Sequence, residues 1–222
     1  MAAKGTGATV AQIADSTTVG GNNRGTYATD WQKIRSGAGG VASGACSTIS
    51  GGSGNTAVGA SSFVGGGRYN TANGDCSTAS GGYNNTANAT NSTVGGGRAN
   101  LACGGNSTVG GGCSNIASGG YSTVGGGRYN TAICGYSTVG GGASNTACCY
   151  NSFIGGGSIN TACGPHSTVG GGACNTASGY YTTVAGGITN TASTSYSSCY
   201  SYGQQLVVVG VTHQVGIVVE QQ

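Results

Sequence analysis

Residues that could carry out acid–base or nucleophilic chemistry are few in this chain of 222 residues. The carboxylates and histidines are Asp15, Asp30, Asp75, Glu220, His166 and His213. Charged residues make up 5% of the chain, against about 25% in a typical globular domain. No arrangement among them resembles a nucleophile with its base, so we expect that the protein is not an enzyme.

Cysteine is the other residue type with chemistry of its own. The ten cysteines lie at positions 46, 76, 103, 113, 134, 148, 149, 163, 174 and 199, and no Cys-x-x-Cys pair occurs, so zinc and thioredoxin motifs are absent. Two pairs, Cys148 with Cys163 and Cys134 with Cys149, share one and the same spacing along the chain. We expect free thiols, with disulfides as the alternative, and we expect no metal and no cofactor. The glycine triplets are not phosphate loops, because no Gly-Lys-Ser/Thr follows them.

The spacing of these cysteine pairs is the period of a repeat that organises most of the chain. From Ser47, the phrase Ser-Thr-Val-Gly-Gly-Gly-x-x-Asn-Thr-Ala-x-Gly-x-x returns ten times without insertion. Numbering each unit from 1 to 15, positions 5 and 6 are always Gly, position 9 is always Asn and position 11 is always Ala. Position 3 is Val or Ile except at Ala79. The 49 glycines exclude a helical bundle, and the missing three-residue period excludes collagen.

The repeat predicts an all-β fold, a parallel β-solenoid or β-roll of ten 15-residue coils. Ser-Thr-Val and Asn-Thr-Ala are short alternating segments, typical of strands, and the glycines between them suit tight corners. If Val94 and Ala102 point inward, Asn100 does too and Thr93 points outward. Coils about 4.8 Å apart would make a rod of roughly 48 Å. The inward asparagines would then form a structural ladder from coil to coil: Asn55, Asn70, Asn85, Asn100, Asn115, Asn130, Asn145, Asn160, Asn175 and Asn190.

The core of such a coil is thin, and this suggests partners. Each coil offers one Val-sized residue and one Ala, whereas ordering the backbone of one coil costs roughly 15–30 kcal/mol. Several identical chains around one axis would bury more surface per coil. We therefore expect a homo-oligomer whose number of chains the residues leave open.

The repeat resembles known fibre repeats. Ser-Thr-Val-Gly-Gly followed by Ala-x-Gly is similar to the head repeat of trimeric autotransporter adhesins, and the longer phrase is similar to repeats of phage and large-virus fibre proteins. The resemblance covers residues 47–199 and implies a left-handed β-roll in a homotrimer. The unit here is one residue longer than the adhesin unit, and position 4 is mostly Gly instead of aliphatic.

The leading hypothesis is a structural fibre protein of a virus or phage particle, with attachment to the host as an additional role that the sequence leaves open. Residues 1–15 contain no apolar run long enough for a secretory signal, which favours a virion protein assembled in the host cytoplasm. The alternative is a secreted bacterial adhesin or filament subunit, located outside the cell or on its surface. The third hypothesis is an ice-binding solenoid, which would need two outward threonines on one strand where this repeat offers one.

The two ends differ from the shaft. Residues 1–46 are expected to hold degenerate capping coils, with Ala42 and Gly44 in repeat register, and a segment that docks to other virion proteins. The docking candidates are Trp31, Lys33 and Arg35. Residues 200–222 contain two β-branched runs, too short and interrupted to span a membrane, and they predict a C-terminal β cap or a binding tip.

Two outward stripes are candidates for surface contact. Arg68, Arg98 and Arg128 share position 7 in alternate coils, and Tyr69 and Tyr129 follow two of them. We expect this stripe to serve solubility, with contact to an anionic host-surface glycan as the sharper alternative and no nucleic-acid binding. Positions 14 and 15 collect aromatic residues, which we expect to pack against a neighbouring chain, with sugar stacking as the alternative: Tyr121, Tyr136, Tyr150, His166, Tyr180, Tyr181 and Tyr196.

Overall fold

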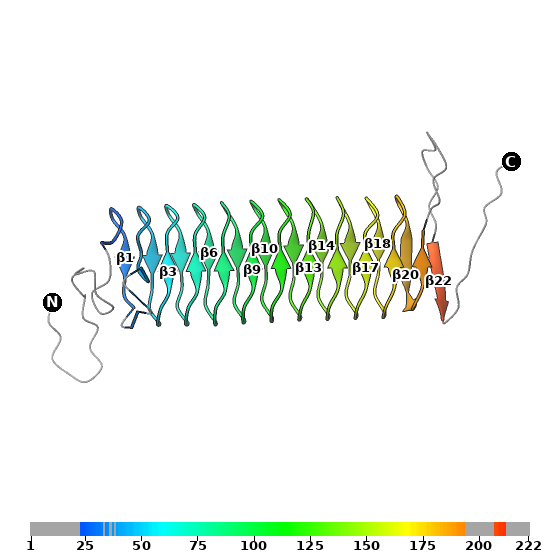
Figure 1. Cartoon of the computed structure of the whole chain (residues 1–222), viewed down its shortest axis with the longest axis horizontal. Coiled ribbons are helices and arrows are strands. Elements are labelled where there is room, and N and C mark those ends of the chain that lie inside the picture. Colours follow the sequence, from blue (N-terminus) through cyan, green and yellow to red (C-terminus); the bar gives the residue numbers. More distant parts are fainter. Residues whose placement is uncertain (1–22, 33, 36, 38, 194–206, 212–222) are drawn as a thin grey trace.

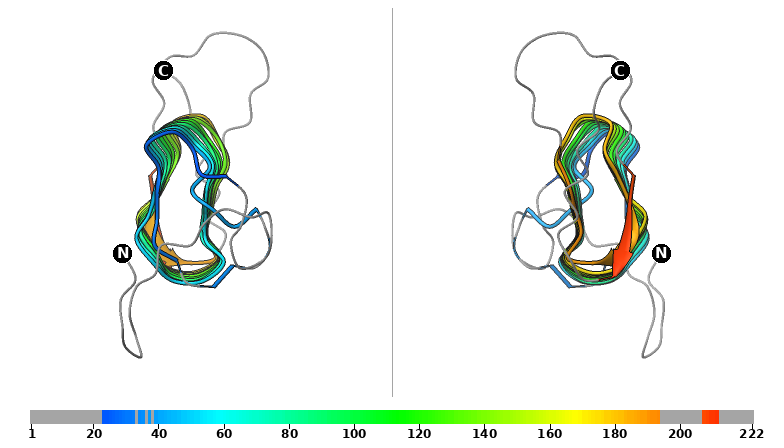
Figure 2. Two further views of the ribbon diagram at one scale, coloured as in Figure 1. Left: turned by 90° about the vertical axis from the view of Figure 1, so that its left-hand side faces the viewer. Right: turned by 90° about the vertical axis from the view of Figure 1, so that its right-hand side faces the viewer.

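The computed structural model describes residues 23–32, 34, 35, 37, 39–193 and 207–211. These residues form a straight rod in which the chain winds through about eleven parallel turns, and no helix occurs in this part of the chain (Figure 1). Viewed along the rod, the turns superimpose as a narrow oblong loop with two long sides (Figure 2). The predicted all-β parallel solenoid is therefore confirmed.

Two parallel sheets form the long sides of the rod. The first sheet contains, in spatial order, β1 (Thr29–Asp30), β2 (Thr48–Ile49), β4 (Phe63–Val64), β6 (Thr78–Ala79), β8 (Thr93–Val94), β10 (Thr108–Val109), β12 (Thr123–Val124), β14 (Thr138–Val139), β16 (Phe153–Ile154), β18 (Thr168–Val169), β20 (Thr183–Ile188) and β22 (Val207–Val211). The second sheet contains β3 (Thr56–Ala57), β5 (Thr71–Ala72), β7 (Thr86–Ala87), β9 (Leu101–Ala102), β11 (Ile116–Ala117), β13 (Thr131–Ala132), β15 (Thr146–Ala147), β17 (Thr161–Ala162), β19 (Thr176–Ala177) and β21 (Thr191–Ala192).

One repeat unit makes one turn, because strands separated by one full unit pair in register. Thr123 lies opposite Thr138 and Val124 opposite Val139, and the same offset holds along both sheets of the shaft. The Cα atoms of Cys148 and Cys163, in neighbouring turns, are 4.8 Å apart. In-register stacking explains why the repeat tolerates no insertion, since one extra residue would turn the side chains of a strand to the other face.

The core lies between the two sheets and comes from a single chain. The Val or Ile column at position 3 faces the Ala column at position 11, and both columns are fully buried from Ile49 to Ala192. At Ala79, where the large side chain is missing, the core divides into two clusters. The outward threonines next to these residues, such as Thr123, are partly exposed, as the alternation predicted.

The rod has one more turn than the ten predicted, and the additional turn lies at the N-terminal end. Strand β1 pairs with β2, so that Thr29 lies opposite Thr48, farther along the chain than one repeat unit. Ala42, later in the same turn, lies opposite Ala57 at the regular repeat spacing. The additional residues are therefore accommodated between Ile34 and Ala42. This turn occupies the segment in which the register of Ala42 indicated degenerate capping coils.

At the opposite end, β22 pairs with β20 and continues the first sheet. The pairing begins at Thr183 with Val207 and continues through a bulge between Val184 and Gly186. Val207–Val211 therefore forms a strand, as the β-branched run predicted, and its role as a β cap or a binding tip stays a prediction. The rest of the 200–222 segment lies outside the described residues.

Candidate functional site

The asparagine column forms the polar spine of the shaft. The side chain of Asn130 donates from Nδ2 to the carbonyl oxygens of Gly126, at 2.8 Å, and Gly142, at 2.9 Å. Its Oδ1 accepts a 3.0 Å hydrogen bond from the backbone amide of Asn145. The predicted connection from coil to coil is confirmed, but the asparagines bond to backbone groups instead of to one another's amides.

The same contacts recur along the column, and all ten asparagines are buried. From Asn55 to Asn175, each side chain donates to a carbonyl oxygen of its own turn and to one of the next turn, and its Oδ1 accepts from the next asparagine's backbone amide. Because buried polar groups are costly without partners, this wiring explains why position 9 never varies. Because both Nδ2 hydrogens of these side chains already donate to backbone carbonyl oxygens, the column has a structural role, as we expected.

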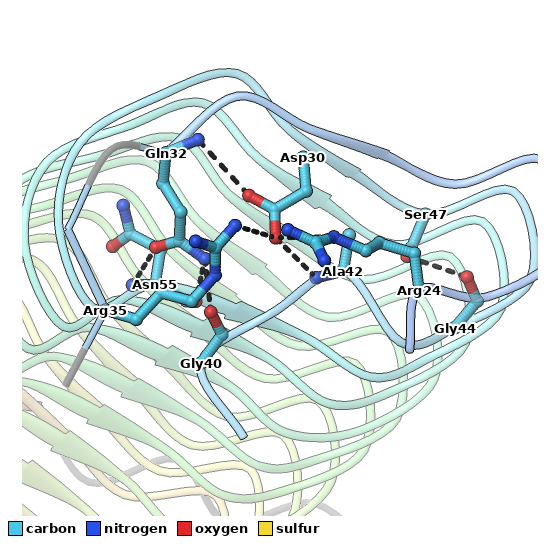
Figure 3. A network of polar contacts seen from close by, with 9 residues as sticks. All are labelled: Arg24, Asp30, Gln32, Arg35, Gly40, Ala42, Gly44, Ser47 and Asn55. Atoms are coloured by element: carbon cyan, nitrogen blue, oxygen red, sulfur yellow. Dashed lines mark hydrogen bonds and ion pairs between the residues drawn. The ribbon is translucent and has the colours of Figure 1, made fainter. Parts of the chain in front are cut away.

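A polar network closes the N-terminal end of the spine (Figure 3). Gln32 takes the place of an asparagine: its Oε1 accepts from the backbone amide of Asn55 at 2.8 Å, and its Nε2 donates to the carbonyl oxygens of Gly40 and Asn55. Asn55 is the first asparagine of the column, so Gln32 supplies the acceptor that Asn130 supplies to Asn145. The longer glutamine side chain fits the enlarged first turn.

Asp30 holds the rest of this network together. Its Oδ2 atom lies 3.2 Å from Arg35 Nη2 and 3.7 Å from Arg24 Nε, and its carboxylate also accepts from the backbone amides of Gln32 and Ala42. A buried carboxylate requires this kind of pairing. The network therefore covers the end of the core and pins the additional residues of the first turn.

Of the three docking candidates, the two that the structure describes differ in their exposure to solvent. Arg35 is only 4% exposed, so its role as a surface docking residue was wrong: the cation is used internally, against Asp30. Trp31 is half-exposed and has a side chain available at the surface. Lys33 lies outside the described residues. The sequence signal for this buried network was the cluster of charged residues and a glutamine between Arg24 and Arg35, in a chain that is otherwise almost uncharged. We assigned Lys33 and Arg35 to surface docking and did not consider that the charges of this cluster could pair with one another.

The arginine stripe exists as a column on one edge of the rod. Single-residue bridges connect position 7 from turn to turn, and they place Arg68, Tyr83, Arg98, Cys113 and Arg128 in consecutive register. All three arginines are exposed. The guanidinium carbon of Arg68 lies 4.6 Å from the Tyr69 ring centroid, and the corresponding distance from Arg128 to Tyr129 is 5.4 Å.

Arg68 is additionally oriented by a 3.0 Å hydrogen bond from Nη2 to the Tyr69 hydroxyl. This hydrogen bond raises the pKa of Arg68 above its ordinary value, so the group stays charged. The Tyr69 ring also meets Tyr83 edge-on, with centroids 5.9 Å apart. The stripe therefore combines two cations that lie over tyrosine rings, Arg68 and Arg128, with exposed aromatic surface.

Aromatic residues of positions 14 and 15 stack on one another within the same chain. The Tyr121 and Tyr136 rings are parallel, with centroids 5.1 Å apart, and His166 stacks on Tyr181 at 4.7 Å. These contacts lie within one chain, and the tyrosine rings remain exposed, so packing against a neighbouring chain stays a prediction, with sugar stacking as its alternative. Tyr196 lies outside the described residues.

The cysteines divide between one disulfide and free thiols. Cys148 and Cys163, at position 12 of neighbouring turns, are bonded, which was the alternative to our expectation of free thiols. The thiols of the other described cysteines are free, including the pair Cys134 and Cys149. Burial raises the pKa of the Cys103 thiol, which keeps it protonated near neutral pH.

Within the described residues, no group of three or more His, Cys, Asp or Glu side chains could hold a metal ion. The same part of the chain contains no helix long and apolar enough to cross a membrane. No protein-family model matches the chain, and the search of curated proteins gave no significant match. The geometry itself therefore has to support any functional conclusion.

Proposed function

We propose that the protein is a structural fibre component of a virus or phage particle, in which the solenoid separates an attachment end from a distal end and in which three chains associate. The observation that carries the proposal is the use of the invariant repeat positions. Asn at position 9 and Ala at position 11 are buried, and the second glycine at position 6 lies against the next turn. These residues, which never vary between repeats, thus hold neighbouring turns together, as expected for a protein whose role is to form a rod.

The proposed trimer is supported by the resemblance of the repeat to trimeric fibre repeats. In the structure, one chain buries its valine, alanine and asparagine columns completely, and each turn of the shaft except that of Ala79 contributes one Val-sized residue and one Ala to the core, as expected. Association would have to use the outer faces, where apolar side chains such as Phe63, Phe153 and Ile159 are exposed.

The fibre proposal is tested by shortening the shaft. Deleting residues 107–136 removes two whole units, preserves the register and shortens the rod by about 10 Å. We expect this variant to fold and to join purified source particles, as scored by gel and electron microscopy. Deleting residues 1–22, or replacing the half-exposed Trp31 by Ala, should instead reduce incorporation while leaving the rod folded.

One combination of results would contradict the proposal. Loss of incorporation in the two-unit deletion, together with normal incorporation of both N-terminal variants, would mean that docking lies in the repeats. The truncation stops at residue 22 because removing all of residues 1–46 would also remove Gln32 and Asp30, which cap the core.

The secreted adhesin or filament subunit is the second candidate, and the disulfide favours it. A bond between Cys148 and Cys163 persists most readily in an oxidising, extracellular environment. Mapping peptides from unreduced protein of the natural source, after blocking free thiols, tests this point. Disulfide-linked protein in the cell-surface fraction would support the adhesin, whereas reduced protein in purified particles would support the virion fibre.

The third hypothesis, ice binding, gains nothing from the structure. Each sheet has one outward threonine column, and apolar residues interrupt these columns at Phe63, Leu101, Ile116 and Phe153.

A further inference from the structure

The positive charge of the shaft is confined to one edge and is not neutralised there. Between residues 47 and 193 the sequence has three cationic side chains, Arg68, Arg98 and Arg128, and one carboxylate, Asp75. Asp75 lies at position 14, away from position 7, and accepts a hydrogen bond from the backbone amide of Ala60. Within the described residues the ion pairs are those of Asp30 in the N-terminal cap, so none involves these three arginines.

The three arginines form a series with a regular interval. They occupy alternate turns of the position 7 column, with Tyr83 and Cys113 in the turns between them. Because one turn advances the chain by 4.8 Å, successive arginines are about 9.6 Å apart along the rod. This interval exceeds the Debye length of about 8 Å at physiological ionic strength, so each cation can engage a separate anionic group.

Two of the cations are held in place before any ligand arrives. Tyr69 and Tyr129 lie under the guanidinium groups of Arg68 and Arg128, and Arg68 is also hydrogen-bonded to its tyrosine. A planar guanidinium held in this way loses less side-chain entropy on binding and presents its remaining donors in the fork that carboxylates accept. The exposed rings of Tyr83 and Tyr129 add surface on which the apolar face of a sugar can pack.

We infer that this edge binds an extended acidic polysaccharide carrying one anionic group per disaccharide, which lies along the rod with its acid groups on successive arginines. The sugar units of such a chain each advance by about the height of one solenoid turn, so an acid on every second sugar meets an arginine on every second turn. The polysaccharide therefore matches the arginine column in the spacing of its charges as well as in their sign. Nucleic acid fits less well, because duplex phosphates follow one another at about 3.4 Å per strand. This inference stands apart from the fibre proposal, since it concerns only the isolated shaft.

The column offers a matched pair of substitutions for testing the interval. Ser158 lies two turns beyond Arg128 and continues the series, whereas Ala143 lies one turn beyond it and falls between the steps. Both residues occupy position 7 and are partly exposed. Ser158→Arg and Ala143→Arg therefore add the same charge to the same edge, in phase and out of phase with the existing arginines.

The probe is a hyaluronan oligosaccharide, which carries one carboxylate per disaccharide, and the measurement is its Kd for the purified full chain at several salt concentrations. Ser158→Arg should tighten binding by roughly two- to fivefold, the effect expected of one more exposed ion pair, while Ala143→Arg should change it much less. Arg98→Gln, in the middle of the series, should weaken binding and reduce its salt dependence, and Asp75→Asn should have little effect. Circular dichroism checks that each variant keeps the fold.

Three results would overturn the inference. Equal tightening by Ser158→Arg and Ala143→Arg would mean that only total charge matters. Stronger binding of single-stranded oligodeoxythymidine than of hyaluronan, lost in Arg98→Gln, would assign the edge to nucleic acid. Absence of hyaluronan binding at low salt would mean that the arginines serve solubility alone. Each result is obtained without source particles and is therefore independent of the incorporation test.

Discussion

The asparagines from Asn55 to Asn175 use both amide hydrogens and the side-chain oxygen for backbone groups of their own turn and the next turn. For Asn130 the two acceptors, Gly126 O and Gly142 O, and the donor, Asn145 N, leave little tolerance for another side chain. Aspartate has nearly the same shape but no amide hydrogens. Replacing Asn130 by Asp therefore tests the contribution of the hydrogen bonds while leaving the shape of the side chain nearly unchanged.

Asn130→Asp should lower the free energy of unfolding by more than about 3 kcal/mol at neutral pH, because a buried carboxylate would face two carbonyl oxygens. The charged form is disfavoured in the folded state, so the pKa of this carboxyl should rise above its ordinary value. The damage should consequently shrink as the pH falls towards about 4 and the carboxyl is protonated. Thermal unfolding at several pH values measures both effects.

Thr131→Ser is the control for this experiment, since Thr131 is the next residue but only partly buried on the outer side. We expect it to shift the thermal midpoint slightly at every pH. Equal effects of the two substitutions would show that the asparagine column does not contribute as the structure indicates.

At the scale of the turn, the two invariant glycines have different reasons to be glycine. Gly127 has a φ of 84°, and a Cβ atom there would overlap the carbonyl oxygen of Gly142 in the next turn. A Cβ atom on Gly126 would meet nothing within 4 Å. We expected both glycines of the pair to serve a tight corner. Of Gly126 and Gly127, only Gly127 has the backbone conformation and the close approach that require glycine, whereas position 5 has a φ between 152° and 157° at Gly51, Gly66 and Gly96.

Gly127→Ala should therefore destabilise the rod by at least about 2 kcal/mol, through the left-handed backbone and the overlap with the next turn. Gly126→Ala, one residue earlier, should have a much smaller effect. Thermal or denaturant unfolding of the pair is the measurement. Comparable losses at both positions would mean that the corner is constrained in a way that the Cβ contacts do not capture.

Two positions of the repeat unit have a left-handed backbone conformation that the repeat sequence does not indicate. The left-handed conformation at positions 8 and 15 is adopted by non-glycine residues, with φ values such as 57° at Ile159 and 56° at His166. Both positions vary freely in the sequence, and a β-branched residue such as Ile159 is unfavourable there. The parallel stacking of each turn on the next imposes this conformation, because every turn must follow the same path.

For the whole molecule, the state of association tests the trimer that is part of the fibre proposal. A trimer would run at three times the mass of a single chain in light scattering coupled to gel filtration, with a β-rich far-UV spectrum and negligible helix. Because one chain already encloses its core, a folded monomer is physically acceptable. Finding it would contradict the trimer while leaving the solenoid intact.

The sequence by itself determined the solenoid, the length of its turn and the inward asparagine and alanine columns. A strict 15-residue period leaves in-register stacking as the consistent solution, and alternation then decides which side chains face inward. Only the tertiary structure decided what the single irregular turn does. Gln32 replaces an asparagine, and Asp30 draws Arg35 inside, through contacts with Asn55 and Ala42 that no period encodes. Likewise, the enclosure of the valine, alanine and asparagine columns within one chain depends on how closely the two sheets approach, a distance that the order of residues does not contain.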